Sequence, residues 1–387
     1  MALRAVLFLS ATALVFVAAV LGPAVASGQT KADHVAERLA ADLTWTSAER
    51  DVRFGHMDQI FPVHVVRRGG AVRALPRGRQ LVLAGLDEVM QTEHLSGVLV
   101  LQHGRVRVER YGLGADAATR WTSFSVTKAM TDTLVGAAVA AGSIHALDDA
   151  ATLYLPQLTG SAYDGVTVRQ LMTMTSGVQW NEDYTSPTAD NVRLYTAAVP
   201  PGANRVVEYM RHLPRAVAPG TRWHYSTGET DLLGVLLRAA TGKSLAQQLS
   251  TALWQPAGME RDATWIATAA DARGEEFGGS GLSATLRDFG RVGLWVLSTH
   301  HTTVAADWFT EAGRPQVSLP GGVGYGYGWW PQADGSFAAL GIFGQSVLID
   351  PKRDLVVVML GDSATASGSG AVRSAMWLQV KAVLDGE

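Results

Sequence analysis

Two predicted strands lie next to each other early in the chain. Residues 98–102 form a short apolar run, and Arg105–Tyr111 alternates polar and apolar side chains, as a half-buried strand does. His103 and Gly104 separate the two runs and favour a tight turn. The pattern therefore predicts a β-hairpin.

Strand patterns return near the end of the chain. Residues 347–349 and 355–360 are apolar runs, and the segment between them, Asp350–Asp354, has the composition of a turn. A helical pattern over residues 371–384 follows. The C-terminal region therefore predicts a second pair of strands and a closing helix.

Between the two strand groups, apolar residues recur at helical spacing. Gly142 and Gly242 end two of these stretches, as C-terminal helix caps commonly do, and Thr167 precedes a third as an N-cap. Helices are predicted over residues 125–141, 168–173, 229–240 and 283–297.

The order of strands, helices, strands and a final helix predicts an α+β fold. We expect an antiparallel sheet flanked by helices from about residues 50–125 and 285–387. An all-helical subdomain from about 126–284 is inserted between them, with the active site at the junction. Residues 62–80 are rich in Pro, Gly and Arg and predict a surface segment without regular structure.

The composition narrows the classes of function. Hydrophobic residues make up 47% of the 387 residues and charged residues 17%, which supports a sizeable folded core. A net charge of −3 without a basic run gives no reason to expect nucleic acid as a partner. The absence of cysteine excludes disulfides, thiol nucleophiles and thiolate metal sites. There is also no His-Glu-x-x-His pattern, so we expect neither a metal nor another cofactor.

The N-terminus has the pattern of a secretory signal peptide. Arg4 precedes an apolar run from Ala5 to Leu21, and Ala24-Val25-Ala26 is a small-x-small cleavage pattern. We therefore expect residues 1–26 to direct export to the periplasm or the medium. The alternative is an uncleaved membrane anchor, since the run is near the lower length limit of a spanning helix.

Ser125-Val126-Thr127-Lys128 is the first motif with chemical potential. A Ser and a Lys three residues apart share one face of a helix. The positive end of the helix favours a developing alkoxide, and a neutral lysine can accept the serine proton. Lys128 is one of five lysines in a chain that otherwise uses arginine, and arginine cannot deprotonate. The alternative is a surface lysine beside an ordinary helix-cap serine.

Two further motifs follow in the sequence. Tyr225-Ser226-Thr227 precedes a predicted helix, where Tyr225 can act as an acid or base beside Lys128 or simply pack in the core. Gly341-Ile342-Phe343-Gly344-Gln345 opens a predicted strand. The backbone N–H groups of Gln345 and Ser125 would form an oxyanion hole.

These three motifs, in this order and at similar spacing, resemble those of the serine β-lactamase and penicillin-binding-protein superfamily. The phrases Leu147-Asp148-Asp149 and Leu171–Gly177 are similar to its class C-related branch. Within that branch, Ser176–Tyr184 and Tyr225–Asp231 resemble the 6-aminohexanoate-dimer hydrolases, which open linear amides and often esters. The resemblance runs from about residue 50 to the end of the chain and implies a β-lactamase/transpeptidase-like fold.

The resemblance also implies residues that bind substrate. Tyr184 would lie on a mobile loop over the cleft and contact the substrate, and Phe343 and Gly344 of the third motif would lie beside it. Asp190 would pair with a substrate amine, unless it is only a solvated loop acid.

Two departures from the superfamily pattern bear on the substrate. Thr227 stands where the second motif usually has Asn, and Ile342 stands where the third usually has Lys or His. That basic residue would grip a substrate carboxylate. We therefore predict a serine hydrolase that acts on a small neutral amide or ester through an acyl-enzyme on Ser125. The alternatives are a β-lactamase or D-alanyl-D-alanine carboxypeptidase, and an exported binding or sensor protein without turnover.

Overall fold

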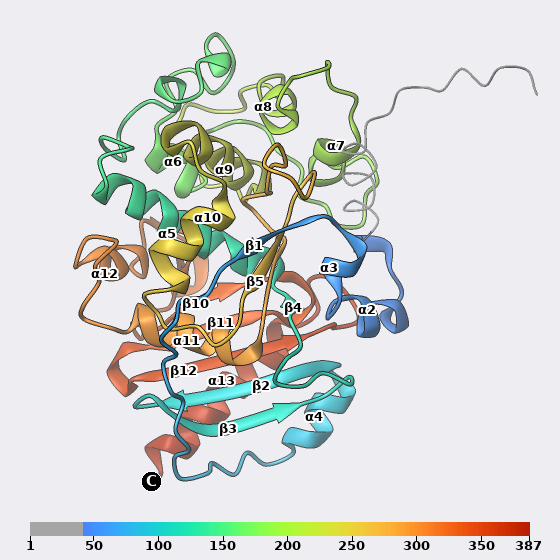
Figure 1. Ribbon diagram of the computed structural model, residues 1–387, viewed down its shortest axis with the longest axis vertical. Helices are drawn as coiled ribbons and strands as arrows, with labels where there is room; N and C mark the ends of the chain where they lie inside the picture. The colour runs from blue at the N-terminus through green and yellow to red at the C-terminus, as the bar shows by residue number, and fades with distance from the viewer. Residues whose placement is uncertain (1–41) are drawn as a thin grey trace, which may run out of the picture.

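The computed structural model describes residues 42–387, and Figure 1 shows their arrangement. The predicted signal peptide, residues 1–26, lies outside the described residues. Across residues 42–387, no helix has both the length and the apolar character needed to cross a bilayer.

A six-stranded antiparallel sheet forms the lower half of the molecule in Figure 1. It joins the two predicted strand groups, because the strand from the N-terminal hairpin pairs directly with the last strand of the chain. The predicted hairpin turn is confirmed, with His103 at φ 49° and Gly104 at φ 67°. The strand order is β3 (Arg105–Tyr111), β2 (Leu95–Gln102), β12 (Leu355–Gly361), β11 (Ser346–Asp350), β10 (Phe337–Leu340) and β9 (Trp330–Pro331).

Helices cover both faces of this sheet. Helix α11 (Leu286–Val296) packs on one face, where Gly290 and Gly293 let the helix approach the strands closely. Helices α4 (Leu86–Thr92) and α13 (Gly370–Asp385) cover the other face. The central strands are therefore buried on both sides, which explains their continuous apolar runs.

A second, four-stranded sheet lies between the first sheet and the helices. Its order is β1 (Val63–Val66), β5 (Ala263–Ile266), β6 (Leu282–Ala284) and β4 (Trp121–Thr122). Residues 63–66 are therefore a strand, although we expected no regular structure there, and range 126–284 contributes two strands besides its helices. Strands of two to four residues are too short to show a period-2 pattern in the sequence.

The helical region occupies the upper half of the view in Figure 1. Helix α5 packs against α9, and the predicted caps are confirmed: the Thr167 hydroxyl accepts from Gln170 N, and Gly242 ends α9 at φ 69°. The helices of this region are α5 (Thr127–Ala140), α6 (Val168–Met172), α7 (Asp190–Thr196), α8 (Arg205–Met210), α9 (Thr227–Thr241) and α10 (Leu245–Leu249).

The described chain also has shorter elements. Among them are η1 (Asp42–Thr44), α2 (Ser47–Arg53), α3 (Met57–Ile60), α12 (Trp308–Ala312), β7 (Val317–Ser318) and β8 (Gly324–Tyr325). Helix α11 begins later than predicted, because Ser283 pairs in β6 and Thr285 caps the helix. The predicted α+β fold, with a sheet drawn from both ends of the chain, is confirmed.

Candidate active site

Ser125 lies at the entrance of helix α5, in the 3-10 turn η2 (Phe124–Val126). The turn is anchored from its N-terminal side, where Ser123 donates from both its backbone N–H and its hydroxyl to Leu282 O in β6, at 2.9 and 2.7 Å. The α-helix itself begins at Thr127, two residues later than predicted. Ser125 therefore sits just before the positive end of a 14-residue helix.

Lys128 projects from the first turn of α5 and is 1% exposed. Its Nζ lies 3.0 Å from Ser125 Oγ, 3.0 Å from Thr227 Oγ1 and 2.9 Å from the carbonyl oxygen of Gly279. The structure thus brings the first and second motifs together on one amino group, and it adds a backbone acceptor from the Gly-rich segment before β6.

Thr227 connects Lys128 to the carboxylate of Glu182, which was not among the predicted site residues. The Thr227 hydroxyl donates to Glu182 Oε1, and its backbone N–H donates to Glu182 Oε2 at 3.0 Å. Trp180 Nε1 and the Tyr184 hydroxyl also donate to Glu182. Glu182 lies in the segment that carried the family resemblance, but only the fold shows that this carboxylate, 45 residues from Thr227, meets it.

Two more carboxylates lie buried near Lys128. Burial raises the pKa of Asp231 to about 6, opposed by the Gly279 N–H, which donates at 2.7 Å, and by the charge of Lys128. Burial also raises the pKa of Asp132 well above its usual range, against the charge of Lys128. Burial therefore shifts the pKa of both acids near the lysine upward.

Tyr225 lies just before α9 with its ring toward Lys128. The ring centroid is 5.1 Å from Lys128 Nζ, and the ring stacks on Trp330 at 6.0 Å with an interplanar angle of 25°. Tyr325 and Trp223 complete this aromatic cluster, so the segment that holds β8 and β9 borders the site. Among the described residues, the Tyr225 hydroxyl has no hydrogen-bond partner. Its predicted part in proton transfer stays a prediction.

The third motif forms the turn η7 (Ile342–Gly344) between β10 and β11. Phe343 has a left-handed backbone, with φ 59°, and its side chain is 2% exposed among Phe54 and Phe124. We expected Phe343 to lie beside the substrate. Its side chain instead belongs to the core, where an aromatic ring gains most from burial, and Ile342 faces the site.

The backbone at Gln345 is held firmly. Its buried side-chain amide donates to Gly361 O at 2.7 Å and accepts from Gly361 N at 3.1 Å. Gly344 precedes it at φ 107°, a conformation that requires glycine. The oxyanion role of the Gln345 N–H remains a prediction.

Ser125 faces a small cavity of about 50 Å³. Its walls include Glu182, Tyr184, Tyr195 and Ile342, together with Asp42 and Leu43 from the segment before α2. Burial, and secondarily the nearby Glu182 carboxylate, raise the pKa of Tyr184 well above its usual range. Among the described residues that line the cavity, none is Lys, Arg or His.

Asp190 does not line this cavity. Its carboxylate accepts from the backbone N–H of Asn181 at 2.7 Å and from the Tyr209 hydroxyl. The side chain therefore ties the start of α7 to the preceding loop and to α8. Both oxygens are engaged in these contacts, so Asp190 is more than a solvated loop acid, and its pairing with a substrate amine stays a prediction.

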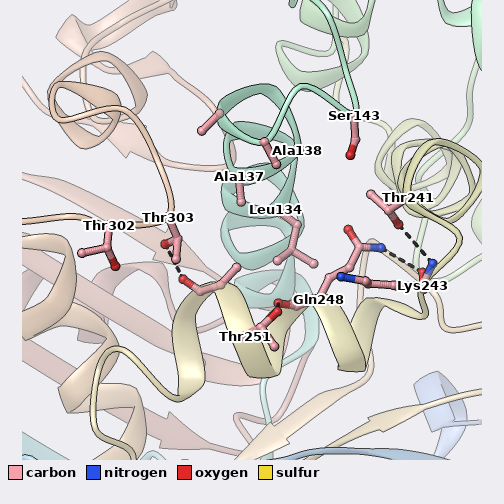
Figure 2. A pocket seen from close by; sticks show the side chains of 13 residues that line it. Leu134, Ala137, Ala138, Ser143, Thr241, Lys243, Gln248, Thr251, Thr302 and Thr303 are labelled. Carbon is pink, nitrogen blue, oxygen red and sulfur yellow. Dashed lines mark hydrogen bonds between the residues drawn. The ribbon is translucent and has the colours of Figure 1, made fainter.

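A larger hollow lies at the other end of α5 and is shown in Figure 2. It has a volume of about 380 Å³ and is bordered by Leu134, Lys243, Gln248 and Thr303. Neither Ser125, Lys128 nor Thr227 lines it. Its size therefore does not mark it as the reaction site.

One cluster of potential metal ligands occurs in the described part of the chain. His94 Nδ1 lies 3.4 Å from a carboxylate oxygen of Asp51 and 3.4 Å from one of Asp362. Arg50 Nε, however, lies 3.4 Å from the other oxygen of Asp362 and supplies a positive charge there. Burial, then repulsion from Asp51, raise the pKa of Asp362 to about 6. We interpret the cluster as an ion-pair network that holds α2 against the end of β12.

Comparison with known proteins agrees with this fold. The sequence pattern of the Beta-lactamase family matches residues 84–380. The chain is 29% identical over 364 residues to the 6-aminohexanoate-dimer hydrolase of Paenarthrobacter ureafaciens, which covers 86% of this chain and 91% of that protein. It is 30% identical over 201 residues to esterase EstB of Burkholderia gladioli, or 47% of this chain and 50% of that one.

A solved structure shares the fold. It is a Bacillus anthracis protein assigned as a 6-aminohexanoate-dimer hydrolase, with a TM-score of 0.76 at 24% identity, covering 87% of this chain and 94% of that chain. The sheets, the helical region and the Ser–Lys pair at the start of α5 define a protein of the β-lactamase/transpeptidase-like class. The chain belongs to the Beta-lactamase family. The predicted resemblance is thereby confirmed.

Proposed function

We propose that the chain is a serine hydrolase that cleaves amide or ester bonds through an acyl-enzyme on Ser125. The observation that carries the proposal is the position of Lys128 Nζ, 3.0 Å from Ser125 Oγ and held by two other partners. Hydrolysis of amides or esters is further supported by the names of the relatives, a 6-aminohexanoate-dimer hydrolase and an esterase.

The contacts of Lys128 determine where its free electron pair points. The Gly279 carbonyl can only accept a hydrogen bond. The Thr227 hydroxyl donates its hydrogen bond to Glu182, so the hydroxyl oxygen accepts from Lys128. Two N–H groups are thereby assigned, and the remaining position of the amine faces Ser125. A neutral Lys128 directs its lone pair at the Ser125 hydroxyl and can take its proton.

Acyl transfer then follows from this arrangement. Ser125 Oγ attacks the substrate carbonyl carbon, and its proton passes to Lys128 Nζ. The backbone N–H groups of Ser125 and Gln345 stabilise the negative oxygen. The tetrahedral intermediate collapses, and the leaving amine or alcohol takes the proton from Lys128, either directly or through Tyr225. Water then attacks the acyl carbon and gives one proton to Lys128. The bond from the acyl carbon to Ser125 Oγ breaks, Oγ takes that proton back, and the acid product leaves.

The walls of the cavity favour a substrate without a carboxylate. No basic side chain is among the described residues that line it, whereas Glu182 and Asp42 are acids. A substrate carboxylate would lose its hydration without a charged partner, which is costly. We therefore propose linear amides and esters as substrates, ahead of β-lactams and D-alanyl-D-alanine peptides, which are anionic.

The proposal is tested by labelling the enzyme with a fluorophosphonate probe. The parent should form a covalent adduct, Ser125→Ala should not, and Ser186→Ala, on the loop before α7, should label like the parent. Hydrolysis is then compared for p-nitrophenyl esters, a linear oligoamide, nitrocefin and a D-alanyl-D-alanine peptide. Absence of a Ser125-dependent adduct and of any hydrolysis would support a binding protein instead. Fast nitrocefin turnover would disprove the substrate assignment alone.

A further inference from the structure

The segment before α2 closes the cavity in front of Ser125. Asp42 and Leu43, in the turn η1, line the same cavity as Ser125, and Asp42 is only 6% exposed. The remaining space of about 50 Å³ is little more than a few water molecules occupy. The size of this space therefore depends on two residues that come from outside the three motifs.

This segment is fixed close to the cavity. Trp45 packs against Phe54 and Phe61, with ring centroids 6.2 and 6.5 Å apart, and its carbonyl accepts from Arg50 Nη1 at 2.7 Å. Thr46 forms a capping box with Glu49 at the start of α2. Leu43 lies two residues from this anchor, so its side chain is held as part of the wall.

The wall that these residues form carries no charge near neutral pH. Leu43 packs against the main hydrophobic core. Burial raises the pKa of Asp42 to about 8, so its carboxyl group keeps its proton at pH 7. Across the cavity, Ile342, Tyr184 and Tyr195 supply further apolar surface. A group bound here meets steric limits from both sides.

We propose that Asp42 and Leu43 are specificity-determining residues, which set the largest substituent that the cavity beside Ser125 accepts. The inference rests on the proposed serine hydrolase function. It predicts that the size preference of the enzyme changes when either side chain is shortened or enlarged, while the chemistry at Ser125 is kept.

The test compares substrates of graded size on the parent and on Leu43→Ala, Asp42→Ala and Leu43→Trp. One series of p-nitrophenyl esters varies the acyl chain from acetate to octanoate, and one series of acetate esters varies the alcohol. In at least one series, the two alanine variants should raise kcat/KM for the largest relative to the smallest substrate by about tenfold, and Leu43→Trp should lower this ratio. Val52→Ala, on α2 with its side chain 64% exposed, is the matched control and should keep the parent's ratio.

The outcomes separate the two claims. A gain of activity on large substrates cannot come from unfolding, so Leu43→Ala is informative even if its Tm falls. Unchanged ratios in both series, with an active parent and a labelled Ser125, would overturn the inference and leave the hydrolase function standing. A parent without Ser125-dependent turnover would overturn the proposed function itself.

Discussion

Helix α5 has a hollow at each end, and the smaller one is the proposed site of the chemistry. At its N-terminal end, Lys128, Thr227 and Glu182 form a continuous hydrogen-bond chain behind Ser125. At its C-terminal end, the larger hollow in Figure 2 is lined by Thr241, Thr251 and Thr303, whose hydroxyls donate to nearby backbone carbonyls, as Thr303 does to Ala252 O at 2.6 Å. Convergent polar groups, rather than volume, therefore locate the reaction site.

The largest effect should come from Lys128, which contacts Ser125, and Lys243 at the edge of the larger hollow is its control. Lys128→Ala and Lys128→Arg should each lower kcat by at least about 10³-fold, because arginine cannot give up its proton and alanine has none to exchange. Lys243→Ala, at the edge of the larger hollow, should keep kcat within twofold of the parent. Steady-state hydrolysis of p-nitrophenyl butyrate measures both. Comparable losses of kcat in Lys128→Ala and Lys243→Ala would contradict the assignment of the chemistry to the smaller hollow.

The next largest effect on kcat should come from removing the groups that orient Lys128. The two ends of α9 supply a test residue and a control. Thr227 is the first residue of this helix and Thr241 the last. Thr227→Val removes the acceptor for Lys128, and Glu182→Gln removes the carboxylate that orients the Thr227 hydroxyl. Each should lower kcat by on the order of 10- to 100-fold, by misplacing the proton acceptor.

Rescue and a matched control distinguish positioning from folding. Thr227→Ser keeps a hydroxyl and should restore most of kcat, whereas Thr241→Val should leave kcat unchanged, since Thr241 bonds only within its own helix end. The acidic limb of the kcat–pH profile should also move in Glu182→Gln and stay in Thr241→Val. A profile that does not move, combined with a lower Tm, would assign Glu182 a purely structural role.

The long, periodic elements could be predicted from the sequence, because their signals are local. The hairpin of β2 and β3, helix α9 and its Gly242 cap, and the strands β11 and β12 all lie where the pattern placed them. Short strands such as β1 escaped prediction because their pairing partner, β5, is about 200 residues away. Their burial comes from that partner and leaves no periodic signal in four residues.

The residues of the candidate site also differ in whether their sequence signal is local. Ser125, Lys128 and Thr227 stand in motifs that can be read locally, and the fold brings them together. Glu182 and Leu43 reach the site only through contacts between segments distant in the chain. Asp190 shows the same limit, because a carboxylate in a loop looks the same in the sequence whether or not it also joins neighbouring segments, as Asp190 does through Asn181 N and the Tyr209 hydroxyl.

A smaller effect, on thermal stability, should come from a buried acid in the region of the proposed site. The larger hollow offers no counterpart, because no Asp or Glu is among the described residues that line it. Glu229, in the first turn of α9, accepts from Ser176 through Oε1, while Oε2 has no partner among the described residues. Burial raises its pKa to about 8 from an ordinary 4.5. Its contribution to the free energy of unfolding is therefore complete below pH 4.5 and is lost as the pH rises through 8.

Glu229→Gln removes this titration and keeps a neutral side chain of the same shape. The drop in Tm between pH 5 and pH 8 should be smaller in this variant than in the parent, by roughly 2–4 °C for each kcal/mol involved. Glu88→Gln, an exposed position on α4, should keep the parent's drop in Tm. Scanning calorimetry at both pH values measures the drop in Tm. Equal drops in the parent and in Glu229→Gln would show that Glu229 is not protonated in the folded state.

The smallest effect is expected from filling the larger hollow. Ala137 lines it from α5, and Ala137→Leu places three more carbons in space that the structure leaves open. Each fully buried methylene contributes about 0.8 kcal/mol, so this partly buried side chain should change Tm by only a few degrees. The kcat/KM for p-nitrophenyl butyrate should stay within twofold of the parent, because the hydrogen-bond chain at the other end of α5 is untouched. A tenfold loss at unchanged Tm would show that this hollow takes part in turnover, and volume would then have marked a functional site after all.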